Sequence, residues 1–426
     1  MVATKIKGNL QSLMVVLWSA LLFSMIFVPR TFSSIKMVIL GILLFVIFLL
    51  IGGQIVQYCG KTIIGFTVLR LGYGILLIGV GIVRKNAVVA LVDSFRLNII
   101  YILIFSVAIM VIHKKEQFWR IIQVVLFAGC AVAIYSILFL LTNMGIWPER
   151  LFFVLSDGGV GIHEGYTHLT NASLSSLVFL VPFVDVLFVT GYSNEIISRR
   201  LIVFTQVLVA IACIISGRRI LWLVLIAPLV CALLIRRGIS SWNHLKRLIA
   251  IPLIVVIGIV FLQSSSVFAM DNIIERFIEA FANNSENVRI GQMVALWEGF
   301  LKSPLLGSGA GAYIAEYIRS ESFPWVYEMT YNYVLFAGGI IGMTLYAGSL
   351  GTIFFSLVKI IQSNKEEKFM QCAVMYGFIS AIIANATNPY FDSSFDFFWF
   401  LYLPLMYINM TEVNKKEVEE FEVNVC

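Results

Sequence analysis

Three arginines, in two separate parts of the chain, carry the side chains best suited to holding a negatively charged group. Arg218 and Arg219 follow a Ser-Gly pair, and Arg289 lies on the polar face of an otherwise apolar helical segment. A guanidinium group grips phosphate oxygens through paired hydrogen bonds, and a turn at a helix start leaves backbone N–H groups free for an anion. The pattern predicts an anion site. Anchoring of Arg218 and Arg219 at a membrane surface, and plain solvation of Arg289, are the competing interpretations.

Glu328 lies directly before a long apolar run, and Tyr331 lies one helical turn after Glu328. Partial burial of a carboxyl group raises its pKa toward the range in which it can accept a proton from a substrate. We therefore expect Glu328 to act as a general base and Tyr331, on the same helix face, to support it. A solvated carboxylate at the membrane interface is the alternative.

A glycine-rich tract lies between Arg289 and Glu328, with the sequence Pro304-Leu305-Leu306-Gly307-Ser308-Gly309-Ala310-Gly311. It lacks the lysine of a phosphate-binding loop and follows no predicted strand, which argues against a nucleotide fold. Glycines allow a backbone to pass close to a ligand or to a neighbouring helix. We predict that Gly307 and Gly309 contribute to substrate binding, and a flexible turn after a helix is the competing interpretation.

Near the end of the chain, Asp392 and Asp396 lie close to two aromatic residues, Tyr390 and Phe391. Carboxylates beside aromatic rings could line a sugar-binding cleft, and Asp392 is the residue that we assign to it. A plain polar turn between two helices is the more economical interpretation of the same residues.

Metal binding is not expected. His163 and His168, with Glu164 between them, are five positions apart, which is not the i, i+4 spacing of a helical zinc site. The six cysteines show no metal-ligand spacing, and a disulfide framework is not expected either.

The elements that must position these residues are membrane helices. Sixty per cent of the residues are hydrophobic and 13% are charged, against about 25% charged in a soluble domain. In lipid, helices satisfy every backbone polar group internally, and each span needs about 17–25 residues. The sequence predicts an all-α polytopic membrane protein with about twelve spans, at 11–29, 36–53, 62–83, 97–113, 119–142, 171–190, 200–216, 219–235, 247–264, 330–358, 369–386 and 396–411.

Basic residues concentrate in alternate loops, which assigns those loops and both termini to the cytoplasm. Nine helices then occupy 1–262, an outer segment 263–329 carries part of the site, three helices occupy 330–411, and 412–426 is a cytoplasmic tail. Amphipathic patterns predict helices at 271–281 and from Ser285 toward Pro304, lying along the membrane surface over a cavity. The net charge of +6 is dispersed over short loops, so no nucleic-acid binding is expected.

The order of these motifs resembles the bacterial O-antigen polymerase and O-antigen ligase superfamily. Arg289, then the glycine tract beginning at Pro304, then Glu328 opening a helix that reaches Gly342, follow one another as in that family, and the Ser216-Gly217-Arg218-Arg219 hairpin matches a family arginine position. Members have about a dozen membrane helices and one large periplasmic loop before the tenth. The resemblance covers 216–342 in its motifs and the whole chain in its hydropathy pattern.

One departure from the family favours the polymerase branch. The ligases carry a His-Asn pair about eleven residues before a Gly-x-x-Gly motif, whereas Glu328 and Met329 occupy those positions before Gly339 and Gly342 here. The resemblance then implies a metal-independent and cofactor-free glycosyltransferase of the bacterial inner membrane. It would join undecaprenyl-diphosphate-linked repeat units at the periplasmic face, beside membrane lipid, a flippase and a chain-length regulator. Arg289, together with either Arg218 or Arg219, would neutralise the departing diphosphate.

Two other functions fit the same sequence. An O-antigen ligase would transfer the finished glycan to a lipid A core, and the missing histidine counts against it. A flippase for lipid-linked oligosaccharides also suits twelve helices, but a transporter places charges or broken helices at mid-membrane. Arg70, which interrupts the third span, is the one clear charge of that kind in the sequence. Polymers such as capsule are as compatible with these motifs as O-antigen.

Overall fold

The computed structural model describes residues 2–51, 58–155, 159–163, 166–218, 220–225, 285–318, 320–363 and 367–425. The chain divides into two compact units. Unit 1 comprises the described residues of 1–46, 115–282 and 364–381, and unit 2 those of 47–114, 283–363 and 382–426. The expected span 247–264, the expected helix 271–281 and most of the expected span 219–235 lie outside the described residues.

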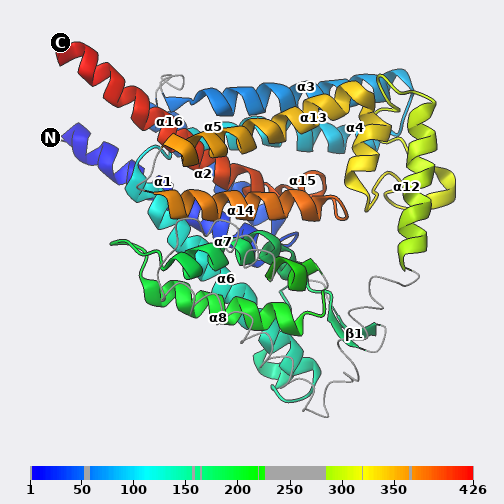
Figure 1. Ribbon diagram of the computed structural model, residues 1–426, viewed down its shortest axis with the longest axis horizontal. Helices are drawn as coiled ribbons and strands as arrows, with labels where there is room; N and C mark the ends of the chain where they lie inside the picture. Colours follow the sequence, from blue (N-terminus) through cyan, green and yellow to red (C-terminus); the bar gives the residue numbers. More distant parts are fainter. Residues whose placement is uncertain are drawn as a thin grey trace. The chain divides into compact units, whose positions relative to one another are not determined.

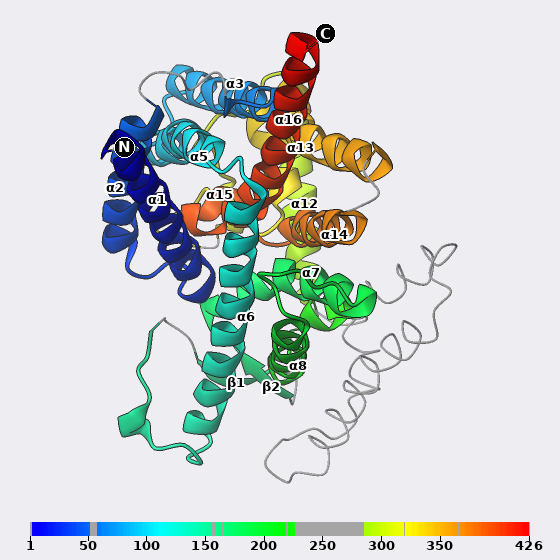
Figure 2. The same cartoon turned by 90° about the vertical axis from the view of Figure 1, so that its left-hand side faces the viewer.

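Unit 1 is built around the long helix α6. This helix contacts α1 and α8, and α7 packs on α8 (Figure 2). Ser198 caps the start of α8 by accepting a hydrogen bond from the Leu201 backbone N–H, and Gly191 ends α7 in the left-handed conformation that glycine adopts without strain. Its elements are α1 (Val2–Phe27), α2 (Ser33–Ile51, which ends in unit 2), α6 (Lys115–Asn143), η3 (Glu149–Leu151), β1 (Val160–His163), β2 (Tyr166–Leu169), η4 (Ala172–Ser176), α7 (Leu177–Thr190), α8 (Arg199–Ile215) and most of α14 (Lys368–Asn385).

The two short strands β1 and β2 form an antiparallel hairpin in the segment that joins α6 to α7. His163 lies opposite Tyr166 and His168 opposite Gly161 in its register. No pattern in the sequence indicated this hairpin, which is the only strand pairing in the part of the chain that the structure describes.

Unit 2 has α3 and α13 as its central pair, lying side by side in Figure 1. The helix α16 packs against α3, α5 and α13 (Figure 2), and α12 runs across the ends of α3 and α13 (Figure 1). Its elements are α3 (Lys61–Val83), α4 (Val88–Phe95), the π-helical turn η2 (Arg96–Ile100), α5 (Tyr101–Met110), α12 (Ser285–Leu301), η6 (Ala315–Tyr317), α13 (Thr330–Ser363), α15 (Tyr390–Ser393), η7 (Phe395–Phe397) and α16 (Trp399–Val425).

The described residues contain eight helices that are long and apolar enough to cross a membrane, so the protein is a polytopic α-helical membrane protein. These spans are Gly8–Phe27, Ser33–Leu50, Lys61–Val83, Val88–Met110, Lys115–Asn143, Ala172–Thr190, Thr330–Ser363 and Lys368–Asn385. Helices α8 and α16 overlap two further expected spans, 200–216 and 396–411, but are not among these eight. The helix α16 continues to Val425, through most of the residues 412–426 that were expected to form a cytoplasmic tail.

Candidate functional site

The glycine tract after α12 is clasped by helices of unit 2. The backbone N–H groups of Ser308 and Gly309 donate to the carbonyls of Phe336 and Ala337, and that of Ala310 donates to the carbonyl of Leu77. Asn86 secures the tract from the other side, its side-chain amide donating to the carbonyls of Ser308 and Ala310 at 3.0 and 2.8 Å.

Three glycines of the tract have left-handed backbones, with φ of +71° at Gly307, +82° at Gly309 and +80° at Gly311. A Cβ at Gly309 would lie 2.6 Å from the Cα of Gly81 in α3. Of the two roles that glycine allows, the structure shows close approach to neighbouring helices. Because the N–H groups of Ser308, Gly309 and Ala310 already have carbonyl partners, substrate binding by Gly307 and Gly309 gains no support from this geometry.

The expected tenth span is broken at Gly339, whose φ of 63° and ψ of −165° are not helical. The next two N–H groups, of Ile340 and Ile341, donate to the carbonyls of Pro304 and Leu305 at 2.8 and 3.2 Å. The glycine tract therefore supplies acceptors to the groups that the break deprives of helical partners. These backbone hydrogen bonds hold the first nine residues of α13 against the glycine tract and the α12 helix that precedes it.

Arg289 and Glu328 meet at the outer edge of this assembly. The Nε–H of Arg289 donates to Oε2 of Glu328 at 3.0 Å, although the two residues are 39 positions apart. Their side chains are 46% and 22% exposed, so solvent or a ligand reaches both. Two of the four residues predicted to be catalytic thus form a single accessible site.

Aromatic and apolar side chains support this pair from within unit 2. Leu296 of α12, Tyr327 and Phe336 belong to one buried cluster, and the rings of Tyr327 and Tyr333 stack at 5.4 Å. The Tyr327 hydroxyl accepts a hydrogen bond from the Ile314 N–H at 2.7 Å, and burial raises the pKa of Tyr327 above its usual value. Tyr327 is therefore a neutral structural neighbour of Glu328.

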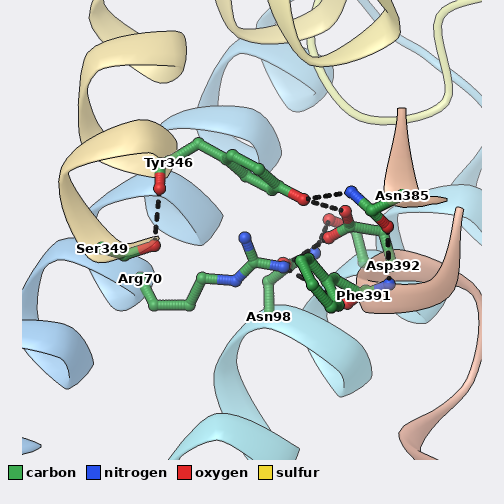
Figure 3. A network of polar contacts seen from close by, with 8 residues as sticks. Arg70, Asn98, Tyr346, Ser349, Asn385, Phe391 and Asp392 are labelled. Carbon is green, nitrogen blue, oxygen red and sulfur yellow. Dashed lines mark hydrogen bonds and ion pairs between the residues drawn. The ribbon is translucent and has the colours of Figure 1, made fainter. Parts of the chain in front are cut away.

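A second polar cluster lies inside unit 2 and is centred on Arg70 (Figure 3). Arg70 is the tenth residue of the span Lys61–Val83, about 20 Å from its Val83 end at 1.5 Å per residue. Its Nη2 donates to Oδ1 of Asp392 at 2.5 Å and to the Phe391 carbonyl at 3.3 Å. The guanidinium carbon also lies 4.4 Å from the ring centre of Tyr346 and 5.4 Å from that of Tyr73, within cation–π range.

The other oxygen of Asp392 is held as well. Oδ2 accepts a hydrogen bond from the Tyr346 hydroxyl at 2.9 Å, and that hydroxyl accepts one from the Asn385 side-chain amide at 3.1 Å. The side-chain oxygen Oδ1 of Asn385 accepts from the Phe391 N–H at 3.0 Å. Arg70, Asp392, Tyr346 and Asn385, called the Arg70 cluster below, join α3, α13, the end of α14 and α15 (Figure 3).

Asp392 does not sit in a plain polar turn, because its carboxylate neutralises an arginine that is only 1% exposed. Tyr331 contacts the same region: its hydroxyl donates to the Ile382 carbonyl at 2.6 Å, and its ring lies 6.2 Å from that of Tyr346. Tyr331 therefore ties the first turn of α13 to the end of α14.

In unit 1, Arg218 is engaged by the protein itself. Its Nε and Nη2 donate to the carbonyls of Leu169 and Asn171 at 3.2 and 2.9 Å, and Nη1 lies 3.4 Å from the Ser175 hydroxyl. The guanidinium therefore holds the end of β2 and the residues that follow it. Arg219 lies outside the described residues.

Sequence reasoning overlooked Arg70, Tyr346 and Asn385 as site residues. The available signal was the arginine within an apolar span, since an ionisable residue at that depth needs a partner. Among the residues that the structure describes, no group of three His, Cys, Asp or Glu side chains is arranged to hold a metal ion.

The chain matches no protein-family model and shows no significant similarity to a curated protein.

Proposed function

We propose that this protein is a polymerase of a bacterial surface polysaccharide such as O-antigen. It would join glycan repeat units carried on undecaprenyl diphosphate at the periplasmic face of the inner membrane. The observation that carries the proposal is the contact of Arg289 with Glu328 at 3.0 Å, just before the first residue of α13. A cation and a carboxylate in one accessible place provide the two charges that such a transfer requires.

The proposed reaction is a displacement at the anomeric carbon of the donor sugar. A hydroxyl oxygen of the acceptor forms the new bond to that carbon, while the bond from the carbon to the diphosphate oxygen breaks. The diphosphate leaves with the electron pair, and Glu328 takes the proton of the acceptor hydroxyl. Arg289 stabilises the negative charge that grows on the leaving group.

The ion pair between Arg289 and Glu328 is suited to being opened by such a substrate. Both side chains are partly exposed, and an ion pair of this kind contributes only about 0–1 kcal/mol to stability. A diphosphate would therefore displace Glu328 from Arg289 at little cost. The carboxylate then loses its cation at the moment when it is needed as a base.

Chain extension by the purified protein in detergent, with lipid-linked repeat units as the only substrate, tests the proposal. Arg289→Ala should reduce the rate by about 10²–10³, and Arg289→Lys should restore part of it because an ammonium keeps the charge without the planar fork. Arg120→Ala is the matched control, since Arg120 forms another exposed pair, with Glu116 at 2.7 Å on α6. Full-length ladders from Arg289→Ala would refute the assignment.

A transporter for lipid-linked oligosaccharides is the second candidate, and the Arg70 cluster is what favours it. An ion pair deep in a membrane span and a helix broken at Gly339 are both features of transporters. The detergent assay separates the two functions, because an enzyme lengthens glycans without a sealed membrane. A transporter shows activity only as movement of lipid-linked glycan across sealed vesicles.

A further inference from the structure

We infer that Arg70 and Asp392 are positioning residues for Glu328, acting through Tyr346 and Tyr331 on the first turn of α13. The inference rests on the proposed function. It gives the ion pair inside the membrane span a role in glycosyl transfer, where the transport hypothesis would give it a role in moving cargo.

Arg70 cannot touch a substrate at the surface pair. Its side chain is 1% exposed. Its guanidinium group contacts Asp392, the Phe391 carbonyl and the rings of the two flanking tyrosines. Any influence on the chemistry must therefore pass through the groups that it holds.

The path from Arg70 to Glu328 is short and consists of directional contacts. Asp392 accepts from the Tyr346 hydroxyl at 2.9 Å, and the Tyr346 ring lies edge-on to that of Tyr331 at 6.2 Å. Tyr331 is the second residue of α13, and Glu328 lies three positions before it.

The end of α14 forms a second connection to the same turn. Asn385 donates to the Tyr346 hydroxyl at 3.1 Å, and the adjoining residue Ala386 accepts from the Thr330 N–H at 3.2 Å. The Thr330 N–H also lies 2.9 Å from the Glu328 carbonyl. The backbone that carries Glu328 is thus tied to the Arg70 cluster at two adjacent residues, Thr330 and Tyr331.

Stability alone does not explain a charged pair at this place. Replacing a buried ion pair by apolar residues of similar size is often neutral or stabilising, because removing two charges from water is costly. The pair contributes orientation instead. The Arg70 guanidinium lies against the Tyr346 ring and the Asp392 carboxylate accepts from its hydroxyl, so together they fix the orientation of the Tyr346 side chain, which apolar packing would leave free. The described residues before α13, by contrast, contain no regular helix at 318 or over 320–329 to hold Glu328 in place.

Tyr346→Phe tests the inference, since it removes one hydroxyl from the cluster and keeps the ring and all charges. Tyr402→Phe is the matched control: Tyr402 is also buried in unit 2, and its hydroxyl donates to the Ile102 carbonyl at 3.0 Å. Chain extension by Tyr346→Phe should show kcat lowered about 10- to 100-fold with KM unchanged, because misplacing a catalytic group by about 1 Å has that effect. Tyr402→Phe should keep both constants, with a comparable shift in melting temperature.

A second measurement reads the geometry without any reaction. In a chain whose six cysteines are replaced, Arg289→Cys and Glu328→Cys are joined by a short bifunctional thiol reagent, with or without Tyr346→Phe. The yield should fall several-fold with Tyr346→Phe and stay constant with Tyr402→Phe. If the wild-type chain extends no glycan but the yields differ as stated, the proposed function fails and the positioning stands. Equal yields, or equal losses of kcat in both phenylalanine variants, would overturn the positioning role.

Discussion

Replacing Gly309 by alanine tests whether the glycine tract holds α12 and α13 together. Gly309 has φ of +82°, and an added Cβ would meet the backbone of Gly81 and Val80 in α3, at 2.6 Å from the Gly81 Cα. Backbone atoms cannot rotate away as a flexible side chain could. The substitution should therefore push the tract off α3 and strain the break in α13.

Two energetic costs determine how far the substitution lowers the free energy of unfolding. A left-handed backbone costs a residue with a Cβ about 1–2 kcal/mol, and inserting an atom into a packed place costs about 1–3 kcal/mol. The free energy of unfolding should therefore fall by about 2–5 kcal/mol. Gly145→Ala isolates the first term, because Gly145 has φ of +72° and open space where its Cβ would lie; it should cost about 1–2 kcal/mol.

Thermal unfolding of the three proteins in the same detergent, followed by chain-extension assays at low temperature, completes the comparison. Gly309→Ala should unfold at a lower temperature than Gly145→Ala and lose activity in proportion to the folded fraction that remains. If both variants unfold together while Gly309→Ala alone is inactive, the tract binds substrate instead of clamping helices, and the reasoning from backbone contacts is refuted.

Substitutions at three further positions test other parts of the structure. Asp185, fully buried in α7, accepts a hydrogen bond from the Gln206 amide at 2.5 Å. In thermal unfolding, Asp185→Asn should lose less stability than Asp185→Ala, because the alanine variant leaves that amide unpaired at a cost of about 1–3 kcal/mol. Burial raises the pKa of Tyr192 to about 12, so the unfolded chain, with a tyrosine pKa of about 10, loses the proton first. Stability should fall as pH rises from about 10 to 12, and Tyr192→Phe should flatten that fall in denaturation midpoints. Glu412 accepts from the Thr62 N–H and hydroxyl at 3.2 and 2.5 Å at the start of α3; Glu412→Ala should cost about 0.5–2 kcal/mol, measured in the same way.

Local patterns in the sequence predicted local structure well. Runs of apolar residues located the spans that the structure describes, and the amphipathic pattern placed the start of α12 at Ser285. The spacing of Gly307, Gly309 and Gly311 indicated a close backbone approach, because few other residues tolerate such a backbone. The sequence could not show whether a ligand or a helix would be approached, since glycine permits both.

Features that depend on distant residues were not predictable in the same way. Arg70 and Asp392 are 322 positions apart, and no spacing rule joins them. The break at Gly339 was missed because its flanking residues are apolar like the rest of the span. The carbonyls that make the break tolerable belong to Pro304 and Leu305, on another segment. The contacts of Arg218 could not be predicted either, because its acceptors are backbone carbonyls, which any sequence supplies.

Exchanging the two charges, with Arg289→Glu and Glu328→Arg in one chain, tests the central claim most directly. The swapped ion pair can re-form across the same 3.0 Å contact, so thermal unfolding should match the wild type. Chain extension in detergent should nevertheless be lost, because the cation and the base would stand at each other's positions relative to the departing diphosphate and the acceptor hydroxyl. Wild-type rates from the swapped protein would show that the pair only holds the structure together, and would contradict the account.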